Sequence, residues 1–238
     1  MKLDILAIAA HPDDVELSAS GTLIKAKKQG KSIGVLDLTG GELGSRGTIE
    51  TRKEEASAAS AILGLDVRVN LGLEDGFFQN NKESQLKIIE QLRKFKPDVV
   101  LINAPYDRHP DHGKGGELAK DACFLSGLSK IQTVIDGQEQ DAWRPRAVYH
   151  YLQDYFITPD IVIDITHEVD KKIESIKAYK TQFYDPNSTE PKTPISGEDF
   201  FEFLKGRWKG YGRLIGADYG EGFKVIRPIG IDDITSLI

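Results

Sequence analysis

The sequence predicts an α/β protein with a three-layer, Rossmann-like fold, in which helices cover both faces of a mostly parallel sheet. Two observations support this prediction. Short apolar runs of strand length alternate with segments of helix length over the first two-thirds of the chain. Polar clusters follow several of the apolar runs, where a fold of this class places its ligand-binding site. The 238 residues are enough for one such domain.

The first two-thirds of the chain is expected to alternate strand and helix. The run at residues 3–10 is apolar almost throughout, as in a strand that is covered on both faces. The helix predicted over residues 15–30 ends in two lysines and a glycine, which are typical of a helix C-terminus. Further strands are predicted at residues 32–38, 67–70 and 98–103, and further helices at residues 49–63 and 84–95 and after His112. Such alternation implies βαβ units with right-handed crossovers.

The last third of the chain is less regular. Strands are predicted at residues 147–151 and 161–165, and helices at residues 169–180 and 198–215. The segment 184–197, rich in Pro, Ser, Thr and Asn, is expected to be an exposed loop that lines or covers a site. No repeat or long linker divides the sequence. We therefore expect a single domain over residues 1–238, with a doubly wound core at 1–130 and a remainder at 131–238 that completes the fold and part of the binding pocket.

Composition excludes several classes of function. The formal net charge of −6 argues against a nucleic-acid-binding protein, which normally displays a basic face, and against binding to anionic membranes. No apolar run approaches the ~20 residues that span a bilayer. Because no secretory leader is recognisable at the start, we expect a cytoplasmic protein. The only cysteine, Cys123, is expected to be a buried apolar side chain rather than a catalytic thiol.

The first candidate site is the cluster His11-Pro12-Asp13-Asp14, which directly follows the first predicted strand. A tight turn can bring the side chains of His11 and Asp14 to one point. Asp13 and Asp14 are neighbours, so they must point in different directions and can take different roles. Capping of the following helix is the plainer explanation, but it accounts for only one of the two aspartates.

The second candidate site, His109-Pro110-Asp111-His112, follows the strand predicted at residues 98–103. Proline favours a tight turn, which can present both imidazoles to one cavity; a polar surface turn is the alternative. Together the two clusters offer His, Asp and His ligands, the number that a catalytic zinc site uses when its fourth position is left to water. The other histidines, His150 and His167, are expected to be structural.

These motifs resemble those of the LmbE-like (PIG-L) zinc N-acetylglucosaminyl deacetylases, over nearly the whole chain. The two histidine clusters, Thr39-x-Gly41-Glu42 after the second strand and Arg52 in the next helix carry the resemblance. Within the family, the chain looks most like the bacillithiol biosynthesis deacetylases. The segments that suggest this are Asp37-Leu38-Thr39, Arg52-Lys53-Glu54-Glu55-Ala56, Asp107-Arg108-His109-Pro110-Asp111-His112-Gly113, Tyr179-Lys180-x-Gln182-Phe183 and Tyr219-x-Glu221-Gly222-Phe223. The related mycothiol-pathway enzymes have a tyrosine at the position of Asp107, so the role of that tyrosine does not transfer.

The resemblance implies a role for each candidate residue. It makes His11, Asp14 and His112 the zinc ligands. It makes Asp13 the general base and His109 the acid or the group that stabilises the oxyanion, with Asp111 orienting His109. The resemblance places Arg52 in contact with substrate, and Glu42 and Arg108 are further candidates for binding it. Either Asp13 or His109 can protonate the leaving amine.

The activity implied by the resemblance is hydrolysis of the acetamide of an N-acetylglucosaminyl conjugate. The metal is expected to be zinc, and iron suits the same ligands. The resemblance implies N-acetylglucosaminyl-malate as the most specific substrate. Arg52, with Arg108 or Arg46, is expected to bind the two carboxylates of its malate; solvated loop charges are the alternative for Arg108 and Arg46. A chitooligosaccharide or a mycothiol-type conjugate is the alternative. The resemblance also implies a homo-oligomer, and the only other partner expected is the small sugar conjugate.

Two functions outside this activity are the alternatives. A metal-dependent hydrolase of another bond, such as a phosphoester, fits the scaffold, but two-metal phosphatases usually need more ligands than these three. A nucleotide-binding module would leave both histidine clusters unexplained. The glycine-rich stretch at residues 40–47 matches no dinucleotide or P-loop fingerprint, and we expect it to be a flexible substrate loop.

Overall fold

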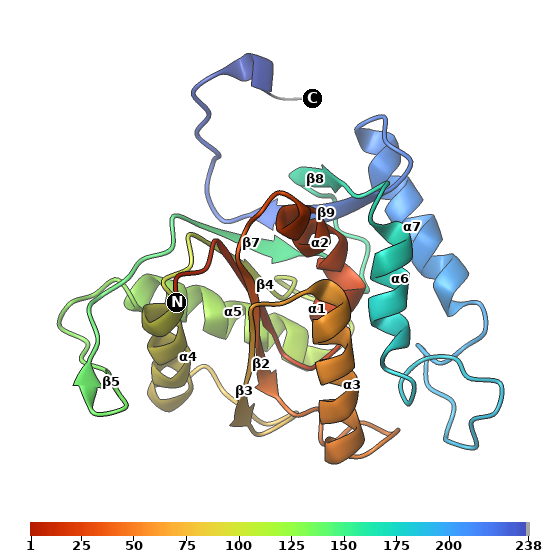
Figure 1. The fold of residues 1–238 in the computed structure, drawn as a ribbon, viewed down its shortest axis with the longest axis horizontal. Coiled ribbons are helices and arrows are strands. Elements are labelled where there is room, and N and C mark those ends of the chain that lie inside the picture. The colour runs from red at the N-terminus through yellow and green to blue at the C-terminus, as the bar shows by residue number, and fades with distance from the viewer. Residues whose placement is uncertain (237–238) are drawn as a thin grey trace.

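The computed structural model describes residues 1–236 and contains a seven-stranded sheet between two layers of helices (Figure 1). The strand order is β3-β2-β1-β4-β7-β9-β8. The parallel strands are β1 (Ile5–Ala9), β2 (Ile33–Thr39), β3 (Val67–Leu73), β4 (Val99–Ile102) and β7 (Ala147–Tyr151). The strand β9 (Gly220–Val225) runs antiparallel to β7 and to β8 (Ile161–Asp164). The predicted α/β fold with a mostly parallel sheet is confirmed.

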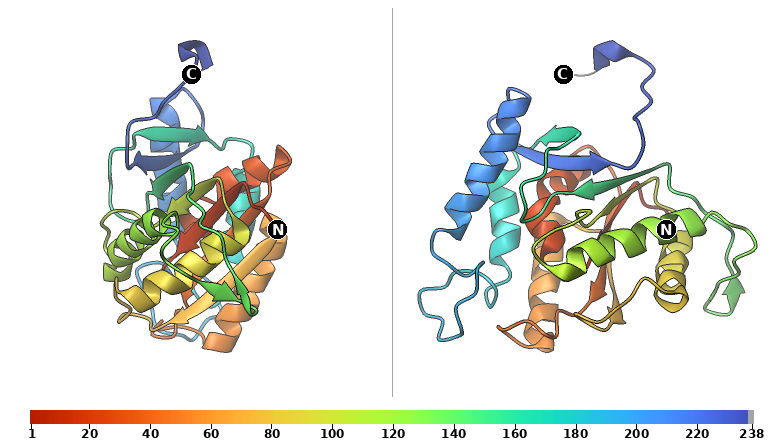
Figure 2. Two further views of the ribbon diagram at one scale, coloured as in Figure 1. Left: turned by 90° about the vertical axis from the view of Figure 1, so that its left-hand side faces the viewer. Right: turned by 180° about the vertical axis from the view of Figure 1, so that it is seen from behind.

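Helices cover both faces of the sheet, as Figure 2 shows. One face carries α1 (Asp14–Ser18), α2 (Ser20–Lys28), α3 (Ile49–Leu63) and α6 (Val169–Lys177), and the other carries α4 (Lys82–Phe95) and α5 (Pro110–Leu125). The helix α7 (Phe200–Leu214) packs beside α6 and next to β8 and β9. A short hairpin, β5 (Val134–Ile135) and β6 (Gln138–Glu139), and a 3-10 turn, η1 (Ile234–Ser236), complete the described elements.

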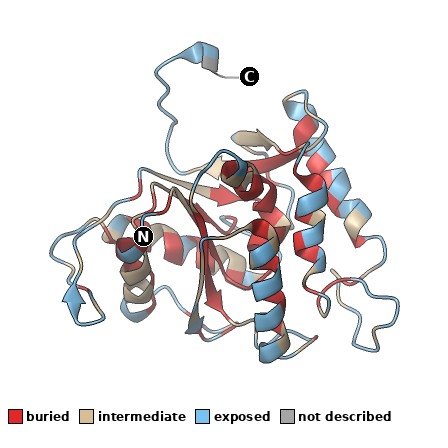
Figure 3. Ribbon diagram, viewed as in Figure 1, coloured by how far each residue is buried: buried red, intermediate tan, exposed pale blue. Residues whose placement is uncertain are grey.

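Alternate side chains of β1 enter different hydrophobic clusters. Leu6 and Ile8 pack with side chains of α4 and α5, whereas Ala7 and Ala9 pack with side chains of α1 and α2. This alternation follows from the two-residue repeat of a strand. Because both faces are covered, β2 is buried throughout, and β1 and β4 are buried apart from their first residues (Figure 3). The continuous apolar run of the first strand is therefore explained.

Several predicted boundaries were wrong. The single helix predicted over residues 15–30 is two helices, α1 and α2, which are separated at Ala19 with φ −134°. The strand β3 continues to Leu73, and α6 ends at Lys177 instead of residue 180. The strand β9 and the β5–β6 hairpin were not predicted. Two glycines in β9, Gly220 and Gly222, lower its intrinsic strand propensity, so pairing with β7 and β8 decides its conformation.

The sheet topology fixes where a ligand can bind. The strand β1 lies between β2 and β4, so the chain crosses to opposite sides of β1 at this point. Doubly wound sheets leave a crevice at the carboxyl ends of the strands at such a switch. His11 follows β1 and His109 follows β4. Both histidine clusters therefore lie at the crevice.

Candidate active site

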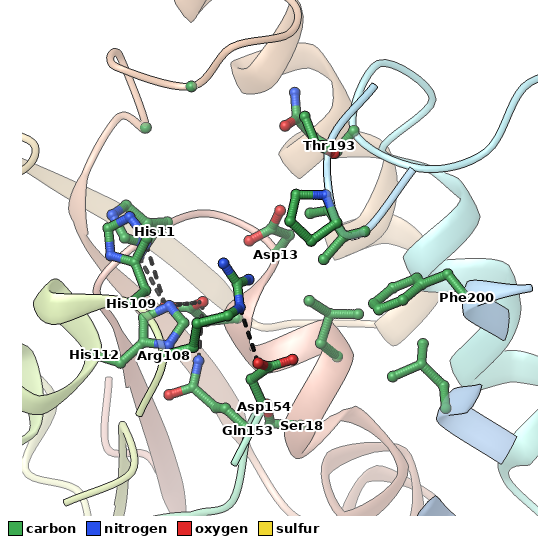
Figure 4. Close-up of a pocket in the computed structure, with 18 of the residues that line it drawn as sticks. His11, Asp13, Ser18, Arg108, His109, His112, Gln153, Asp154, Thr193 and Phe200 are labelled. Carbon is green, nitrogen blue, oxygen red and sulfur yellow. Dashed lines mark hydrogen bonds and ion pairs between the residues drawn. The ribbon is translucent and has the colours of Figure 1, made fainter. Parts of the chain in front are cut away.

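A cavity of about 340 Å³ lies at the carboxyl ends of the parallel strands. Polar side chains gather at the histidine end, whereas Phe200 lies on the other side of Asp13 (Figure 4). The main polar residues in the wall are His11, Asp13, Asp14, Arg52, Asp75, Arg108, His109 and His112. The apolar residues from α7 are Phe200, Phe203, Leu204, Trp208 and Tyr211. The segment 184–197 contributes Thr193, Pro194 and Ile195.

The turn after β1 holds Asp13 in an unusual backbone conformation. Its φ of 116° lies in a region that side-chain-bearing residues rarely adopt, and such conformations persist only where the surroundings enforce them. Asp13 occupies the N-cap position of α1, but its side chain makes no capping hydrogen bond. Instead, Arg52 Nη1 donates to Asp13 Oδ2 at 3.1 Å and to the Pro12 carbonyl at 2.7 Å. Helix capping therefore does not explain Asp13.

The carboxylate of Asp14 lies between two histidines. Its Oδ1 is 3.0 Å from His112 Nε2, and its Oδ2 is 3.8 Å from His11 Nδ1. Asn103 Nδ2 donates to Oδ2 at 2.9 Å, and Gln153 Nε2 donates to Oδ1 at 3.1 Å. These two amides fix the orientation of a carboxylate that is almost fully buried. The turn after β1 and the start of α5 are thus joined through Asp14.

The other nitrogen of each of these histidines faces further carboxylates. His11 Nε2 is 2.9 Å from Asp75 Oδ1 and 3.4 Å from Asp111 Oδ2. His112 Nδ1 is 2.5 Å from Asp107 Oδ2. A carboxylate that accepts a hydrogen bond from the N–H of a neutral imidazole leaves the opposite ring nitrogen with a lone pair for a metal. In both rings, that opposite nitrogen is the one nearest to Asp14.

Burial and charge act in opposite directions on these groups. Burial lowers the pKa of His11 and of His112, but the surrounding carboxylates outweigh it and raise the two values to about 10 and about 9. Burial raises the pKa of Asp13 to about 7, although Arg52 opposes this shift. In Asp14 the balance is reversed, because His112 and His11 hold its pKa below the usual range against the effect of burial. The two adjacent aspartates thus differ sharply in proton affinity.

The donor atoms fit a divalent transition metal. Among the described residues, mutually close ligand atoms occur in two sets, His11 with His109 and His112, and His11 with Asp75 and Asp111. The second set is the poorer cation site, because Lys114 Nζ lies 2.6 Å from Asp111 Oδ1. The opposite nitrogens, His11 Nδ1 and His112 Nε2, flank the Asp14 carboxylate. These three groups form a set of nitrogen and oxygen donors that suits zinc or iron.

Three expectations about individual residues differ from the structure. The Asp111 carboxylate contacts His11 and Lys114, whereas His109 Nδ1 accepts from the Asp111 backbone N–H at 3.3 Å. Glu42 is absent from the cavity wall, because its two oxygens accept from the backbone N–H groups of Gly40 and Asp75. Arg46 is also outside the wall and donates to Ser188. Arg108 does line the cavity, paired with Asp154 at 2.9 Å.

Cys123 and His150 were expected to have structural roles. Cys123 is buried in α5, where burial raises its pKa to about 12. A neutral, enclosed thiol of this kind is structural. His150 lies on β7, and its Nδ1 is 2.5 Å from the Asn103 carbonyl. It is absent from the cavity wall, as expected for a structural histidine.

Comparison with known proteins extends the resemblance. Residues 6–123 match the family described as GlcNAc-PI de-N-acetylase, PIG-L. The chain is 34% identical to the uncharacterized deacetylase YaiS of Escherichia coli, over 64% of this chain and 84% of that protein. The crystal structure of a conserved protein from Thermus thermophilus superposes with a TM-score of 0.85 at 36% identity, covering 98% of both chains. This chain belongs to the PIG-L family.

Membership of the PIG-L family makes the chain an enzyme, a deacetylase of the amidohydrolase type. Deacetylases of the family depend on a metal. A relative with near-complete overlap is the diacetylchitobiose deacetylase of Thermococcus kodakarensis, which is 27% identical over 94% of this chain and 84% of its own length. These matches establish the PIG-L family but do not confirm the expected similarity to the bacillithiol deacetylases within it.

The sequence analysis did not predict four residues that contact the proposed ligands of this PIG-L site. Asp75 and Asp107 contact the histidines, and Asn103 and Gln153 contact Asp14. Asp75 lies in the loop after β3, and Asp107 lies in the loop between β4 and α5. The rule that pointed to strand ends could have found both aspartates. Gln153 carries no such signal, because nothing in the sequence shows that β7 lies beside β4.

Proposed function

We propose that this chain removes the acetyl group from an N-acetylglucosaminyl conjugate, with His11, Asp14 and His112 as ligands of a zinc ion and Asp13 as the general base. The observation that carries the proposal is the division between two adjacent aspartates. Asp14 lies between the two histidines, whereas Asp13 points to Arg52 and into the cavity. One carboxylate is thus placed to bind a metal and its neighbour to accept a proton.

A bound zinc ion would supply Lewis acidity, lowering the pKa of water from ~15.7 toward ~7 and polarising the acetamide carbonyl. Side chains of the protein accept the proton and orient the groups that react. Asp13 accepts the proton of the attacking water, and Arg52 holds that carboxylate in place through a contact of 3.1 Å. Iron is the alternative metal, since it accepts the same ligand types.

His109 is proposed as the donor that stabilises the carbonyl oxygen as it becomes negative. Its ring centroid lies 4.7 Å from that of His11 and 5.2 Å from that of His112. Burial and these two neighbouring imidazoles lower the pKa of His109. Donors aimed at a developing oxyanion typically contribute about 3 kcal/mol each. His109 or Asp13 then protonates the leaving amine.

The proposed conjugate is N-acetylglucosaminyl-malate. Its support is the resemblance of the motifs and a Bacillus subtilis relative named probable N-acetyl-α-D-glucosaminyl L-malate deacetylase 2, 27% identical over 76% of this chain and 84% of its own length. The cavity wall contains Arg52, Arg108 and Arg207, and the first two are the arginines expected to recognise two carboxylates. Both already contact an aspartate, so malate must compete for them. A chitooligosaccharide remains the second candidate, because the diacetylchitobiose deacetylase overlaps nearly the whole chain.

Amine release from a panel of substrates tests the proposal. The panel contains N-acetylglucosaminyl-malate, free N-acetylglucosamine, diacetylchitobiose and p-nitrophenyl phosphate, with metal content measured on the same protein. We expect the malate conjugate to be the best substrate and about one zinc per chain. Equal or absent activity on all acetamides removes the substrate assignment, and phosphate release alone identifies a hydrolase of another bond.

We further propose that the chain forms a homo-oligomer. The segment that follows β9 leaves the body of the molecule in Figure 1 and exposes four isoleucines, namely Ile226, Ile229, Ile231 and Ile234. Exposed apolar side chains gathered on one segment favour a protein interface. Light scattering coupled to size-exclusion chromatography measures the mass, and a monomer would contradict the proposal.

None of the described helices has the length and apolar character that crossing a membrane requires.

A further inference from the structure

The break between α1 and α2 lies in the interior, where several backbone groups need partners outside the regular helical hydrogen bonds. Ala19, at the break, has φ −134° and ψ 4°, which are not helical values. The last carbonyls of a helix and its first N–H groups have no partners within that helix. At this break, α1 ends and α2 begins, so groups of both kinds need partners.

Two side chains from distant parts of the sequence provide these partners. Lys172 Nζ donates to the carbonyl oxygens of Glu16 and Leu17 at 3.0 and 2.9 Å. The Glu16 carbonyl also accepts from Ser20 Oγ at 2.7 Å, so the Leu17 carbonyl depends the more on Lys172. Glu221 accepts from the backbone N–H groups of Gly21 and Thr22 at 2.9 and 2.7 Å. Lys172 Nζ and Glu221 Oε1 are themselves 2.7 Å apart, and both side chains are fully buried. The cation thus meets the carbonyl end of α1 and the anion meets the N–H end of α2, as the helix dipoles favour.

We infer that the Lys172–Glu221 pair positions α1 and, through it, the Asp13–Asp14 turn; this inference rests on the proposed function. The helix α1 has only five residues, too few to hold its own conformation. Asp14 begins α1, and Leu17 and Ser18 at its other end line the cavity. The pair therefore fixes one end of a short helix whose other end carries the proposed base and a proposed ligand.

The surroundings leave little freedom for a replacement. A Cβ at Gly21 would lie 2.8 Å from Ile165 Cγ2 and 2.9 Å from Glu221 Oε1. The Trp208 ring, which also lines the cavity, lies 4.8 Å from Lys172 Nζ. Apolar residues often replace a buried ion pair without loss of stability, but they cannot satisfy the backbone groups at this break. Arg68 holds the Glu16 side chain independently, so loss of the pair is expected to shift α1 without unfolding the protein.

Lys172→Met in the full chain tests this role with cobalt(II) in place of zinc. We expect kcat to fall about 100-fold with little change in KM, because small displacements of catalytic groups have effects of this size. The visible absorption spectrum of the cobalt protein is expected to change, since it reports the arrangement of the ligands. Unchanged kcat and an unchanged spectrum in folded Lys172→Met protein would overturn the inference.

Arg93→Met is the matched control. Arg93 is a buried cation that donates to the carbonyl oxygens of Ser126, Leu128 and Ile131 beyond the end of α5, and it is absent from the cavity wall. Its loss is expected to reduce stability while leaving the cobalt spectrum and kcat as in the wild type. If Lys172→Met does not fold, Glu221→Gln carries the same comparison. It removes the charge and keeps one of the two oxygens that accept from Gly21 and Thr22; Glu221, unlike Lys172, is itself in the cavity wall, so the cobalt spectrum is its deciding readout.

The two proposals can fail separately. Wild-type protein that binds cobalt but releases no amine from any acetamide removes the proposed function, and the spectrum of Lys172→Met still decides whether the pair positions the ligands. Wild-type protein that binds no cobalt overturns both.

Discussion

Adjacent aspartates with opposite surroundings are the central feature at the scale of single residues. Asp14 faces two imidazoles that favour its charged form, whereas burial disfavours the charge on Asp13. The sequence indicated that neighbouring carboxylates must diverge, and the resemblance supplied their roles. The strand-end rule could place Asp75 near the site, but neither the sequence nor the resemblance showed that Asp75 pairs with His11, or that Asn103 and Gln153 pair with Asp14, because these pairings depend on which strands are neighbours in the sheet.

Replacing Asp13 with alanine separates the proposed base from the proposed ligands. We expect near-complete loss of turnover with the metal still bound, because the Asp13 carboxylate is held by Arg52 and is not one of the proposed ligands. Metal content and amine release are measured on the same preparation. Loss of the metal instead would mean that Asp13 and Asp14 have exchanged roles.

Replacing Asp75 with asparagine tests the carboxylate behind His11. Asp75 Oδ1 lies 2.9 Å from His11 Nε2, and loss of such a partner typically weakens metal binding about 10–100-fold. Competition with a coloured chelator measures the affinity. Asp154→Asn is the control, since Asp154 lies in the same cavity wall but pairs with Arg108. Equal affinities in the two variants would contradict the role of Asp75.

At the scale of elements, local sequence predicted most helices and strands but not the interruption at Ala19. The sequence around Ala19 reads as one helix, because the groups that stabilise the break, Lys172 and Glu221, lie about 150 and 200 residues further along. The strand β9 escaped prediction for a related reason. Its conformation depends on β7 and β8, which no local pattern identifies as its neighbours.

The start of β2 offers a prediction about pH. Asp66 Oδ2 accepts from the Ile33 backbone N–H at 2.8 Å, and Lys27 pairs with the same carboxylate. Burial raises the pKa of Asp66, but the bonds from Lys27 and Ile33 outweigh it, so the net pKa lies below the ordinary 3.8. The stabilisation is therefore complete above the unfolded pKa and is lost as pH falls through the folded value.

Denaturant unfolding of Asp66→Asn against the wild type at pH 7 and at decreasing pH measures this effect. The wild type is expected to be the more stable protein at pH 7, and the difference is expected to shrink below about pH 3.8. A difference that does not depend on pH would show that the charge of Asp66 contributes nothing.

At the scale of the whole molecule, the order of the strands determines which loops meet. The switch between β2 and β4 on either side of β1 brings Asp14 and Asn103, which are 89 positions apart, into one site. The alternation of strands and helices was enough to predict this edge of the sheet. The antiparallel β9 and the packing of α7, which complete the cavity wall, depend on tertiary contacts and could not be predicted.

Metal removal is expected to weaken the whole molecule without unfolding it. The proposed ligands lie outside the main hydrophobic clusters, so the core does not need them. Metal at about 1,000 times its dissociation constant stabilises a native state by about 4 kcal/mol. Chelation is therefore expected to lower the Tm, with an unchanged circular dichroism spectrum at about 25 °C. A Tm that is insensitive to chelator would contradict a metal bound to the folded state.

The left-handed backbone at Asp13 is expected to lower the melting temperature at a position where the proposed activity requires an aspartate. A side chain at φ 116° costs about 1–3 kcal/mol, and glycine escapes most of that penalty. Asp13→Gly is therefore expected to melt at a higher temperature than Asp13→Ala, while neither releases amine. Thermal melts of the two variants give the comparison, and equal melting would show that the turn is unstrained. If Asp13→Gly also melts above the wild type, despite losing the contact with Arg52, laboratory selection for heat resistance alone would favour an inactive protein at this position.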